Sequence, residues 1–210
     1  MIRKYLRFYR TNRILQREIK KKGSLKILDV ACGNGRISKE YESDKRFEFH
    51  NIDILESGEL KNYHKLDLEK EEMPFKNKEF DINIGLEIIE HLDYPEQFLE
   101  KNRTVLKDDG SLILSTPNIR FLKWILTLLF KGRFPNTSSD NTFYDSGHRK
   151  YYTLKDLEIL ADKTGFYIEE FYGLTSKEFY DKWKFVKFLF GKRFFVEFFC
   201  VGILVVLKKK

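Results

Sequence analysis

The first residues that could do chemistry form a small-residue turn with an acid at its start. Asp29 stands near the end of an apolar run, and Ala31, Cys32, Gly33 and Gly35 follow it closely. Glycine permits backbone conformations with positive φ and lets a ligand approach the main chain. A carboxylate at this place repels phosphate groups and attracts cations. The turn therefore indicates a site for a cofactor that carries positive charge.

A dinucleotide site is the competing interpretation of this turn. Its fingerprint is G-x-G-x-x-G between a strand and a helix. Ser38 stands where the third glycine would be, and Asp29 would face the pyrophosphate. A tight strand-to-helix connection that binds nothing is the other alternative.

A second group of candidate residues follows the fourth predicted strand. On a helix, Glu87, Glu90 and His91 would share one face, and His148 is a further candidate later in the chain. Carboxylates and imidazoles can ligate a divalent cation such as Mg²⁺ or Mn²⁺. Without a metal, His91 or His148 could act as a general base. We expect His91, His148 and Glu90 to be catalytic, although purely structural roles for these side chains stay open.

Alternating strands and helices must position these residues, and this rhythm predicts a parallel sheet with helices on both faces. The predicted strands span residues 26–31, 46–52, 63–66, 80–85, 111–115, 166–171 and 202–207. The predicted helices span residues 1–22, 35–41, 87–92, 95–105 and 154–163. The Asp-Asp-Gly sequence at 108–110 predicts a turn into the fifth strand.

Residues 117–150 interrupt this rhythm. They begin with Pro117 and Asn118, continue as an aromatic and aliphatic helix, and end in a polar stretch. The segment is too long for an ordinary connection, and long insertions are usually lids or binding elements. Open α/β sheets bind ligands at the carboxyl ends of their strands, so we expect the insertion beside the ligand site.

From Lys26 onward the chain resembles the class I S-adenosylmethionine-dependent methyltransferases. The resemblance implies a Rossmann-like, doubly wound α/β sheet of seven strands with the last strand antiparallel. It also implies an enzyme that transfers a methyl group from S-adenosylmethionine. We expect a basic helix at 1–22, then a single methyltransferase domain at 23–210 with a helical lid at 117–150.

The same resemblance assigns cofactor contacts to the strand ends. Asp53 would accept hydrogen bonds from the ribose hydroxyls, and Asp67 with the backbone of Leu68 would contact the adenine. Gly85 and Leu86 would lie beneath the methionine part. The full implied set is Asp29, Ala31, Cys32, Gly33, Gly35, Asp53, Ile54, Asp67, Leu68, Gly85 and Leu86. Ala31 departs from the family pattern, where a glycine is common.

Glu-x-x-Glu-His with a later histidine resembles two groups within this family. They are the ubiquinone-pathway O-methyltransferases and the small-RNA 3′-end 2′-O-methyltransferases, in which these residues hold a metal near the accepting hydroxyl. The resemblance implies a metal site made by Glu87, Glu90, His91 and His148. Methyltransferases of surface-polysaccharide pathways share the same layout.

Composition limits the class of protein, its partners and its expected location. The 210 residues, 42% hydrophobic and 16% aromatic, can fill the core of an α/β domain and exclude a disordered chain. A formal charge of +7 suits a membrane surface, an anionic substrate or nucleic acid and selects none of them. With two cysteines and no signal-peptide core at the N-terminus, we expect a cytoplasmic protein. The apolar runs at 119–130 and 194–207 are shorter than the ~20 residues needed to cross a bilayer.

Two basic and aromatic segments, 119–133 and 183–195, bear on the acceptor. Such segments can lie in a bilayer interface with their cations near anionic head groups, which suits a peripheral membrane protein and a lipid-linked acceptor. Packing within the domain or on a second subunit is the alternative, and we assign 194–207 to the closing strand. RNA 2′-O-methylation is an alternative function, which is disfavoured because the sequence has no recognisable RNA-binding module. A small-molecule acceptor, methylated on O, N or C, stays open.

Overall fold

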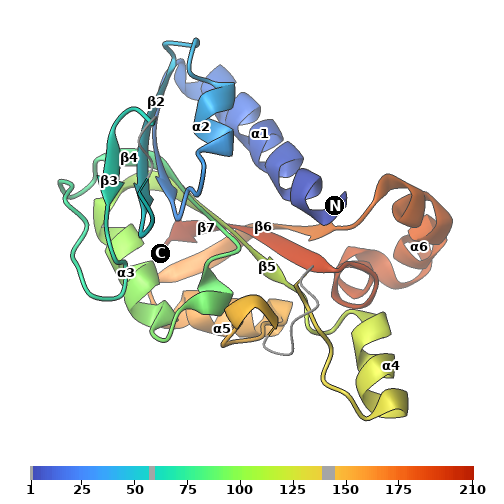
Figure 1. Ribbon diagram of the computed structural model, residues 1–210. Helices are drawn as coiled ribbons and strands as arrows, with labels where there is room; N and C mark the ends of the chain where they lie inside the picture. Colours follow the sequence, from blue (N-terminus) through green and yellow to red (C-terminus); the bar gives the residue numbers. More distant parts are fainter. Residues whose placement is uncertain (1, 57–59, 139–144) are drawn as a thin grey trace.

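The computed structural model describes residues 2–56, 60–138 and 145–210. Seven strands form one sheet in the order β3-β2-β1-β4-β5-β7-β6 (Figure 1). Their bounds are β1 Leu25–Val30, β2 Phe47–Asp53, β3 Tyr63–Lys65, β4 Phe80–Leu86, β5 Leu106–Pro117, β6 Phe166–Leu174 and β7 Gly202–Lys209. The first five strands pair in parallel, and β7 is antiparallel to both β5 and β6. The predicted doubly wound sheet with an antiparallel seventh strand is confirmed.

Six α-helices are present among the described residues. They are α1 Ile2–Lys22, α2 Arg36–Glu40, α3 Pro95–Val105, α4 Leu122–Lys131, α5 Leu154–Lys163 and α6 Lys177–Phe199. Two 3₁₀ turns, η1 Ile89–His91 and η2 Asp145–Gly147, complete the order. None of the described helices, α6 with its 23 residues included, is both long and apolar enough to cross a membrane.

Different helices cover the two faces of the sheet. Side chains alternate along a strand, so Leu28 of β1 points to one face and Ile27 to the other. Leu28 packs in a core with Phe98 of α3 and Leu154 of α5. Ile27 packs in a second core with Leu15 of α1. Figure 1 shows α1 on one side of the sheet and α3 with α5 on the other.

The first helix is fixed to the sheet by apolar residues at helical spacing. Ile14, Leu15 and Ile19 are buried in the second core. Three lysines fill the last turn, where positive charge is favourable at the helix C-terminus. Gly23, with φ of +78°, ends the helix in the left-handed conformation that glycine permits. The helix that we predicted at 1–22 is therefore present and forms part of the domain's core.

Two boundaries differ from the sequence expectation. Phe194–Phe199 belong to α6 and not to the closing strand, and the near-parallel rings of Phe195 and Phe199 stack at 5.8 Å with helical i, i+4 spacing. The strand β5 begins at Leu106, and its register with β4 shifts before Ser111. The predicted turn at 108–110 therefore exists as a bulge inside one strand.

The strand order changes direction between β1 and β4, which are neighbours in the centre of the sheet. From β1 the sheet extends to β2 and β3, and from β4 it extends to β5 on the other side. At such a switch point the connections leave a crevice beyond the carboxyl ends of the strands. The turn after β1 and the segment after β4 both lie at this edge, so the two groups of candidate residues meet at the same end of the sheet.

Candidate active site

Left-handed backbone shapes the turn after β1. Ala31, Gly33 and Gly35 have φ of +57°, +58° and +66°. A Cβ on Gly35 would stand 2.3 Å from the side chain of Leu60 and 2.9 Å from the hydroxyl of Ser38, so this crowding and the positive φ together favour glycine there. Ala31 lacks this freedom, and an L-residue in this region carries a strain of roughly 1–2 kcal/mol.

Asp53 fastens the end of β2 to this turn. The backbone N–H of Gly33 donates to Oδ2 of Asp53 at 2.8 Å, and that of Leu55 donates to Oδ1 at 3.0 Å. These bonds orient the carboxylate, and each oxygen retains a lone pair for another donor. The position predicted to receive ribose hydroxyls is thus rigid and buried, with Asp53 8% exposed.

Asp29 and Asp53 give the turn an acidic character. Asp29 is 5% exposed, and burial raises the pKa of its carboxyl group to about 7, with the charge of Asp53 adding to the effect. Burial, followed by the charges of Asp29 and Asp53, raises the pKa of the Cys32 thiol to about 12. A cationic ligand would lower the energy of both carboxylates, so this environment fits S-adenosylmethionine and opposes a pyrophosphate.

Asp67 lies just beyond β3 and is already engaged with its neighbours. Its Oδ1 accepts from the backbone of Glu69 at 3.0 Å, and Lys70 lies 3.0 Å from Oδ2. The hydrogen bond from Lys70 holds the pKa of this carboxyl group below its usual range, and the bond from Glu69 adds to it. Leu68 packs against the core. A role in adenine binding stays a prediction for both residues.

At the end of β4 the chain is tightly packed. A Cβ on Gly85 would lie 3.0 Å from the side chain of Leu114 and 3.2 Å from that of Phe98, so a larger residue would require both side chains to shift. Leu86 is partly buried beside it, whereas Ile54 after β2 is 58% exposed. Contacts of these residues with the methionine part or the ribose stay predictions.

Glu87 does not belong to the helix that we predicted at 87–92. It has φ of +56°, and only Ile89–His91 form a short 3₁₀ turn. Its Oε1 accepts from the hydroxyl of Ser115 at 3.0 Å, and its Oε2 lies 3.3 Å from Arg7 of α1. Glu87 is therefore not among the residues whose donor atoms converge, and its carboxylate contacts β5 and α1.

The other three predicted ligands do converge. One donor atom each of Glu90, His91 and His148 lie within 4.8 Å of one another. Nε2 of His148 is 4.0 Å from Oε1 of Glu90, and the two imidazole rings are 4.8 Å apart in an edge-to-face arrangement. Glu90 is 1% exposed, and the side chain of His148 is 7% exposed. This is a compact donor set of two imidazoles and one carboxylate.

Hydrogen bonds fix which nitrogen of each imidazole carries the proton. Nδ1 of His91 is 3.2 Å from the carbonyl oxygen of Gly147, which can only accept, so Nδ1 of His91 donates. The hydroxyl of Thr137 donates to Asp145 at 2.6 Å, so its oxygen accepts from Nδ1 of His148 at 2.8 Å. In the neutral form of each ring the lone pair is then on Nε2, which is the form needed to ligate a metal or accept a proton.

The insertion closes over this cluster through its returning end. The carbonyl oxygen of Glu90 accepts from the backbone N–H groups of Arg149 and Lys150 at 2.8 and 3.0 Å. Burial raises the pKa of Asp145, but the hydrogen bonds from Thr137 and Ser138 outweigh it and hold that pKa below its usual range. Our sequence interpretation missed Thr137 and Asp145; a Thr and an Asp near His148 in a polar segment were the available signal. Residues 139–144 of the predicted lid lie outside the described residues.

Comparison with known proteins gives a consistent picture. A family profile described as "Methyltransferase domain" matches residues 2–170. An uncharacterized protein of Methanocaldococcus jannaschii is 29% identical over 184 residues, 81% of this chain and 71% of that protein. A ubiquinone biosynthesis O-methyltransferase of Rickettsia bellii is 28% identical over 175 residues, 76% of this chain and 68% of that enzyme.

Two further matches concern a longer relative and the fold. The mitochondrial ubiquinone biosynthesis O-methyltransferase of Candida albicans is 32% identical over 128 residues, which cover 53% of this chain but only 38% of that enzyme. A SAM-dependent methyltransferase from Archaeoglobus fulgidus superposes with a TM-score of 0.61 at 17% identity and covers 94% of both chains. That likeness shows the shared fold.

Proposed function

This chain belongs to the methyltransferase domain family and is an S-adenosylmethionine-dependent methyltransferase, and we propose that it methylates a hydroxyl oxygen of a small or lipid-linked acceptor. The observation that carries the proposal is the cluster of Glu90, His91 and His148. It lies at the same sheet edge as the cofactor turn, where a methyl donor and an acceptor hydroxyl can meet. The similarity to two ubiquinone biosynthesis O-methyltransferases supports oxygen as the acceptor atom.

On the donor side, S-adenosylmethionine supplies a methyl group bound to a positively charged sulfur. The buried acids Asp29 and Asp53 favour a cation at the turn, and the left-handed backbone of Gly33 and Gly35 lets the ligand approach the main chain. In-line transfer depends on alignment of the two reacting atoms and on exclusion of water. A rigid turn and a nearby closing insertion serve both requirements.

On the acceptor side, the residues fit a divalent metal. Glu90, His91 and His148 would hold Mg²⁺ or Mn²⁺, which would lower the pKa of the acceptor hydroxyl and fix its direction. The fit rests on two Nε2 lone pairs and one buried carboxylate, with each histidine oriented by a hydrogen bond at Nδ1. In metal-free catalysis, Nε2 of His91 would take the hydroxyl proton, and the carbonyl of Gly147 would stabilise the resulting imidazolium.

Activity measurements separate these two routes. We expect methyl transfer to a phenolic or catechol acceptor to cease after exhaustive chelation and to return with Mg²⁺ or Mn²⁺. Glu90→Gln should abolish the metal response while S-adenosylmethionine still binds. Activity that survives both chelation and Glu90→Gln contradicts the metal site. Methylation of RNA 3′ ends in preference to small hydroxyl compounds contradicts the proposed acceptor class.

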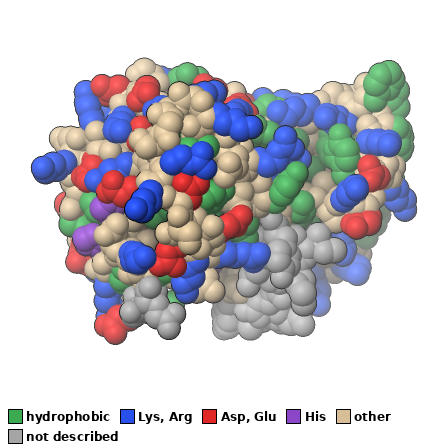
Figure 2. All heavy atoms as spheres, turned by 90° about the horizontal axis from the view of Figure 1, so that it is seen from above, with side chains coloured by type: hydrophobic (Ala, Val, Ile, Leu, Met, Phe, Trp, Pro, Cys, Tyr) green, Lys and Arg blue, Asp and Glu red, His purple; other side chains and the backbone are tan. Residues whose placement is uncertain are grey.

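A lipid-linked acceptor is supported by the surface formed by α4 and α6. A groove of about 540 Å³ between them is lined mainly by apolar side chains, with Lys123 and Lys131 among them. Phe130 of α4 is 77% exposed and Phe188 of α6 is 89% exposed. Figure 2 shows hydrophobic side chains among lysines and arginines at the end of the molecule where α6 lies. An apolar surface with a cationic border is the chemistry that binds an anionic bilayer.

A further inference from the structure

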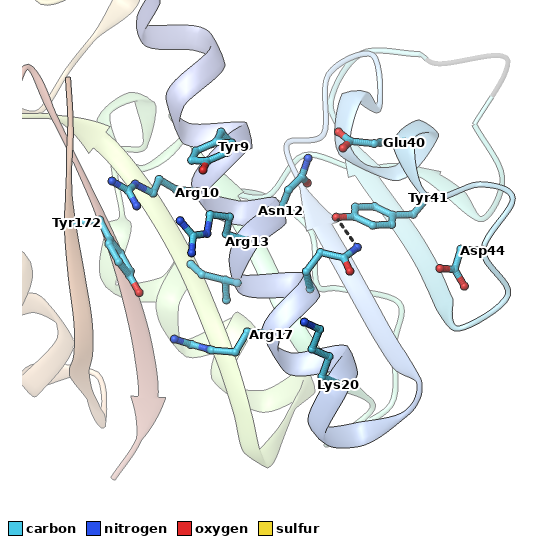
Figure 3. A pocket seen from close by; sticks show the side chains of 12 residues that line it. Tyr9, Arg10, Asn12, Arg13, Arg17, Lys20, Glu40, Tyr41, Asp44 and Tyr172 are labelled. Carbon is cyan, nitrogen blue, oxygen red and sulfur yellow. Dashed lines mark hydrogen bonds between the residues drawn. The ribbon is translucent and has the colours of Figure 1, made fainter. Parts of the chain in front are cut away.

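A groove on α1 carries positive charge outside the methyl-transfer site. It has a volume of about 860 Å³ and is lined by α1, by the segment around the end of α2 and by β6 (Figure 3). Arg10, Arg13 and Arg17 share one side of α1, because residues three, four and seven apart lie on the same helix face. Figure 3 shows all three side chains directed toward the side where Tyr172 of β6 lies.

Only one of these arginines is neutralised. Arg17 lies 2.7 Å from Oε1 of Glu170 and 2.9 Å from Oε1 of Glu18. Arg10 and Arg13 have no ion-pair partner in the part of the chain that the structure describes. Two positive charges therefore face the groove without a carboxylate to balance them.

Lys192 of α6 is a third cation, and it lies beside Tyr172. Nζ of Lys192, in α6, is 5.2 Å from the centroid of the Tyr172 ring, and the guanidinium carbon of Arg10 is 5.5 Å from the same centroid. Burial lowers the pKa of Lys192; Glu170 opposes this, whereas the charges of Lys187 and Arg10 add to it. Cations held around one ring repel one another unless an anion lies among them.

Glu170 is the carboxylate beside Tyr172, and it is already engaged by Arg17 and by the hydroxyl of Tyr172. The two acidic side chains that line the groove lie elsewhere. Figure 3 shows Glu40 and Asp44 on the opposite side of α1 from Tyr172. Asp44 is also paired with Arg46 at 2.6 Å. The charge of the groove is thus divided, with Arg10 and Arg13 on the side of Tyr172 and the two acids on the other side.

We propose that Arg10, Arg13 and Lys192 bind a phosphate or diphosphate group beside Tyr172. Guanidinium groups bind phosphate through paired hydrogen bonds, and an ammonium group adds a point charge. A compact, multiply charged anion matches three cations in a confined place better than an extended polyanion does. The group can belong to a soluble phosphorylated molecule or to a phospholipid head group, and the site does not depend on which hydroxyl is methylated.

Calorimetric titration of the full chain with inorganic pyrophosphate at low ionic strength tests this site. We expect binding by the unmodified protein and an affinity at least about tenfold weaker in Arg10→Gln/Arg13→Gln. The matched control Lys76→Gln/Lys163→Gln removes the same charge from the loop before β4 and from α5, and should bind as the unmodified protein does. S-adenosylmethionine binding, measured on each variant, verifies folding. Absence of pyrophosphate binding, or equal weakening in the control, overturns the proposal.

Two further titrations distinguish the source of the phosphate. Vesicles containing phosphatidic acid that bind more tightly than pyrophosphate, with the same dependence on Arg10 and Arg13, identify a lipid head group. Binding of pyrophosphate without any binding of these vesicles identifies a soluble ligand. A third titration uses single-stranded RNA. If RNA binding requires Arg10 and Arg13 but pyrophosphate binding does not, the phosphate site is overturned in favour of nucleic acid.

Discussion

Arg7 of α1 and Glu87 at the end of β4 form an ion pair, with the guanidinium 3.3 Å from Oε2 and each side chain 14% exposed. The contact joins the first helix to the edge of the active site. Together with the hydroxyl of Ser115, it also holds the carboxylate of Glu87 in place. The N-terminal helix is therefore part of the machinery that shapes this edge.

Arg7→Gln should destabilise the fold and weaken the cofactor site together. Losing the charged partner of a largely buried carboxylate costs about 1–3 kcal/mol in the free energy of unfolding. Urea denaturation measures this loss, and calorimetry measures the affinity for S-adenosylmethionine. Arg13→Gln, on the same helix without an ion-pair partner among the described residues, should change stability by less than about 0.5 kcal/mol. Equal effects of the two variants would contradict the role given to the Arg7–Glu87 pair.

Ala31→Gly should stabilise the protein. Removing the Cβ relieves left-handed strain of roughly 1–2 kcal/mol, and the greater freedom of glycine in the unfolded chain takes back ~0.5–1 kcal/mol. We expect a net gain of roughly 0.5–1 kcal/mol in urea denaturation. Ala161→Gly, in the buried interior of α5, should do the opposite. A loss of stability in Ala31→Gly would show that this turn is not left-handed.

Binding of S-adenosylmethionine should strengthen as the pH rises through about 7. Burial raises the pKa of Asp29 to about 7, above the value of an unfolded Asp, so the folded protein keeps this proton while the unfolded chain loses it. The contribution of Asp29 to stability is thus present at acid pH and is lost as the pH rises from about 4 to about 7. A cationic cofactor prefers the ionised carboxylate, so its affinity should follow the opposite trend.

Calorimetry at about pH 6 and about pH 8 measures this dependence, and Asp29→Asn serves as the control. Asp29→Asn should bind S-adenosylmethionine weakly at both pH values. Its free energy of unfolding should not fall between these two pH values as that of the unmodified protein does. An unmodified protein whose cofactor affinity does not change over this range would contradict the assigned environment of Asp29.

Association with anionic vesicles should depend on the α4–α6 surface. Phe130→Ser/Phe188→Ser removes two of its most exposed aromatic side chains. We expect flotation with anionic vesicles to fall by about tenfold or more, from the apolar area withdrawn from the bilayer. Ile159→Ser, an exposed position on α5, should float like the unmodified protein. An unmodified protein that stays at the bottom of the gradient contradicts membrane docking.

Local signals explain why much of the fold was predictable from sequence. Pro95 at the first helical position and the capping box between Thr153 and Asp156 mark the starts of α3 and α5. Apolar strand segments that alternate with helical segments predict the parallel strands of the sheet. The turn from Asp29 to Gly35 depends on backbone geometry that glycine spacing reveals directly.

The rest depends on contacts between distant parts of the chain. The carboxylate of Glu87 is held by Arg7 and Ser115, which are distant in sequence. A helical pattern read from residues 87–92 alone gives no sign of these contacts. Likewise, the tautomer of His148 follows from Thr137 and Asp145 within the insertion. Convergence of Glu90 with His148 could be expected from the family resemblance, but its geometry needed the tertiary structure.

Titration with Mn²⁺ tests the central claim most directly, because it separates the three-residue cluster from the four-residue set expected from sequence. The protein should bind one Mn²⁺ per chain, and Glu90→Gln and His148→Asn should each weaken that binding at least about tenfold. Glu87→Gln, whose carboxylate faces Arg7 and Ser115, should bind Mn²⁺ like the unmodified protein. Binding that survives Glu90→Gln and His148→Asn, or that is lost in Glu87→Gln, would contradict the account.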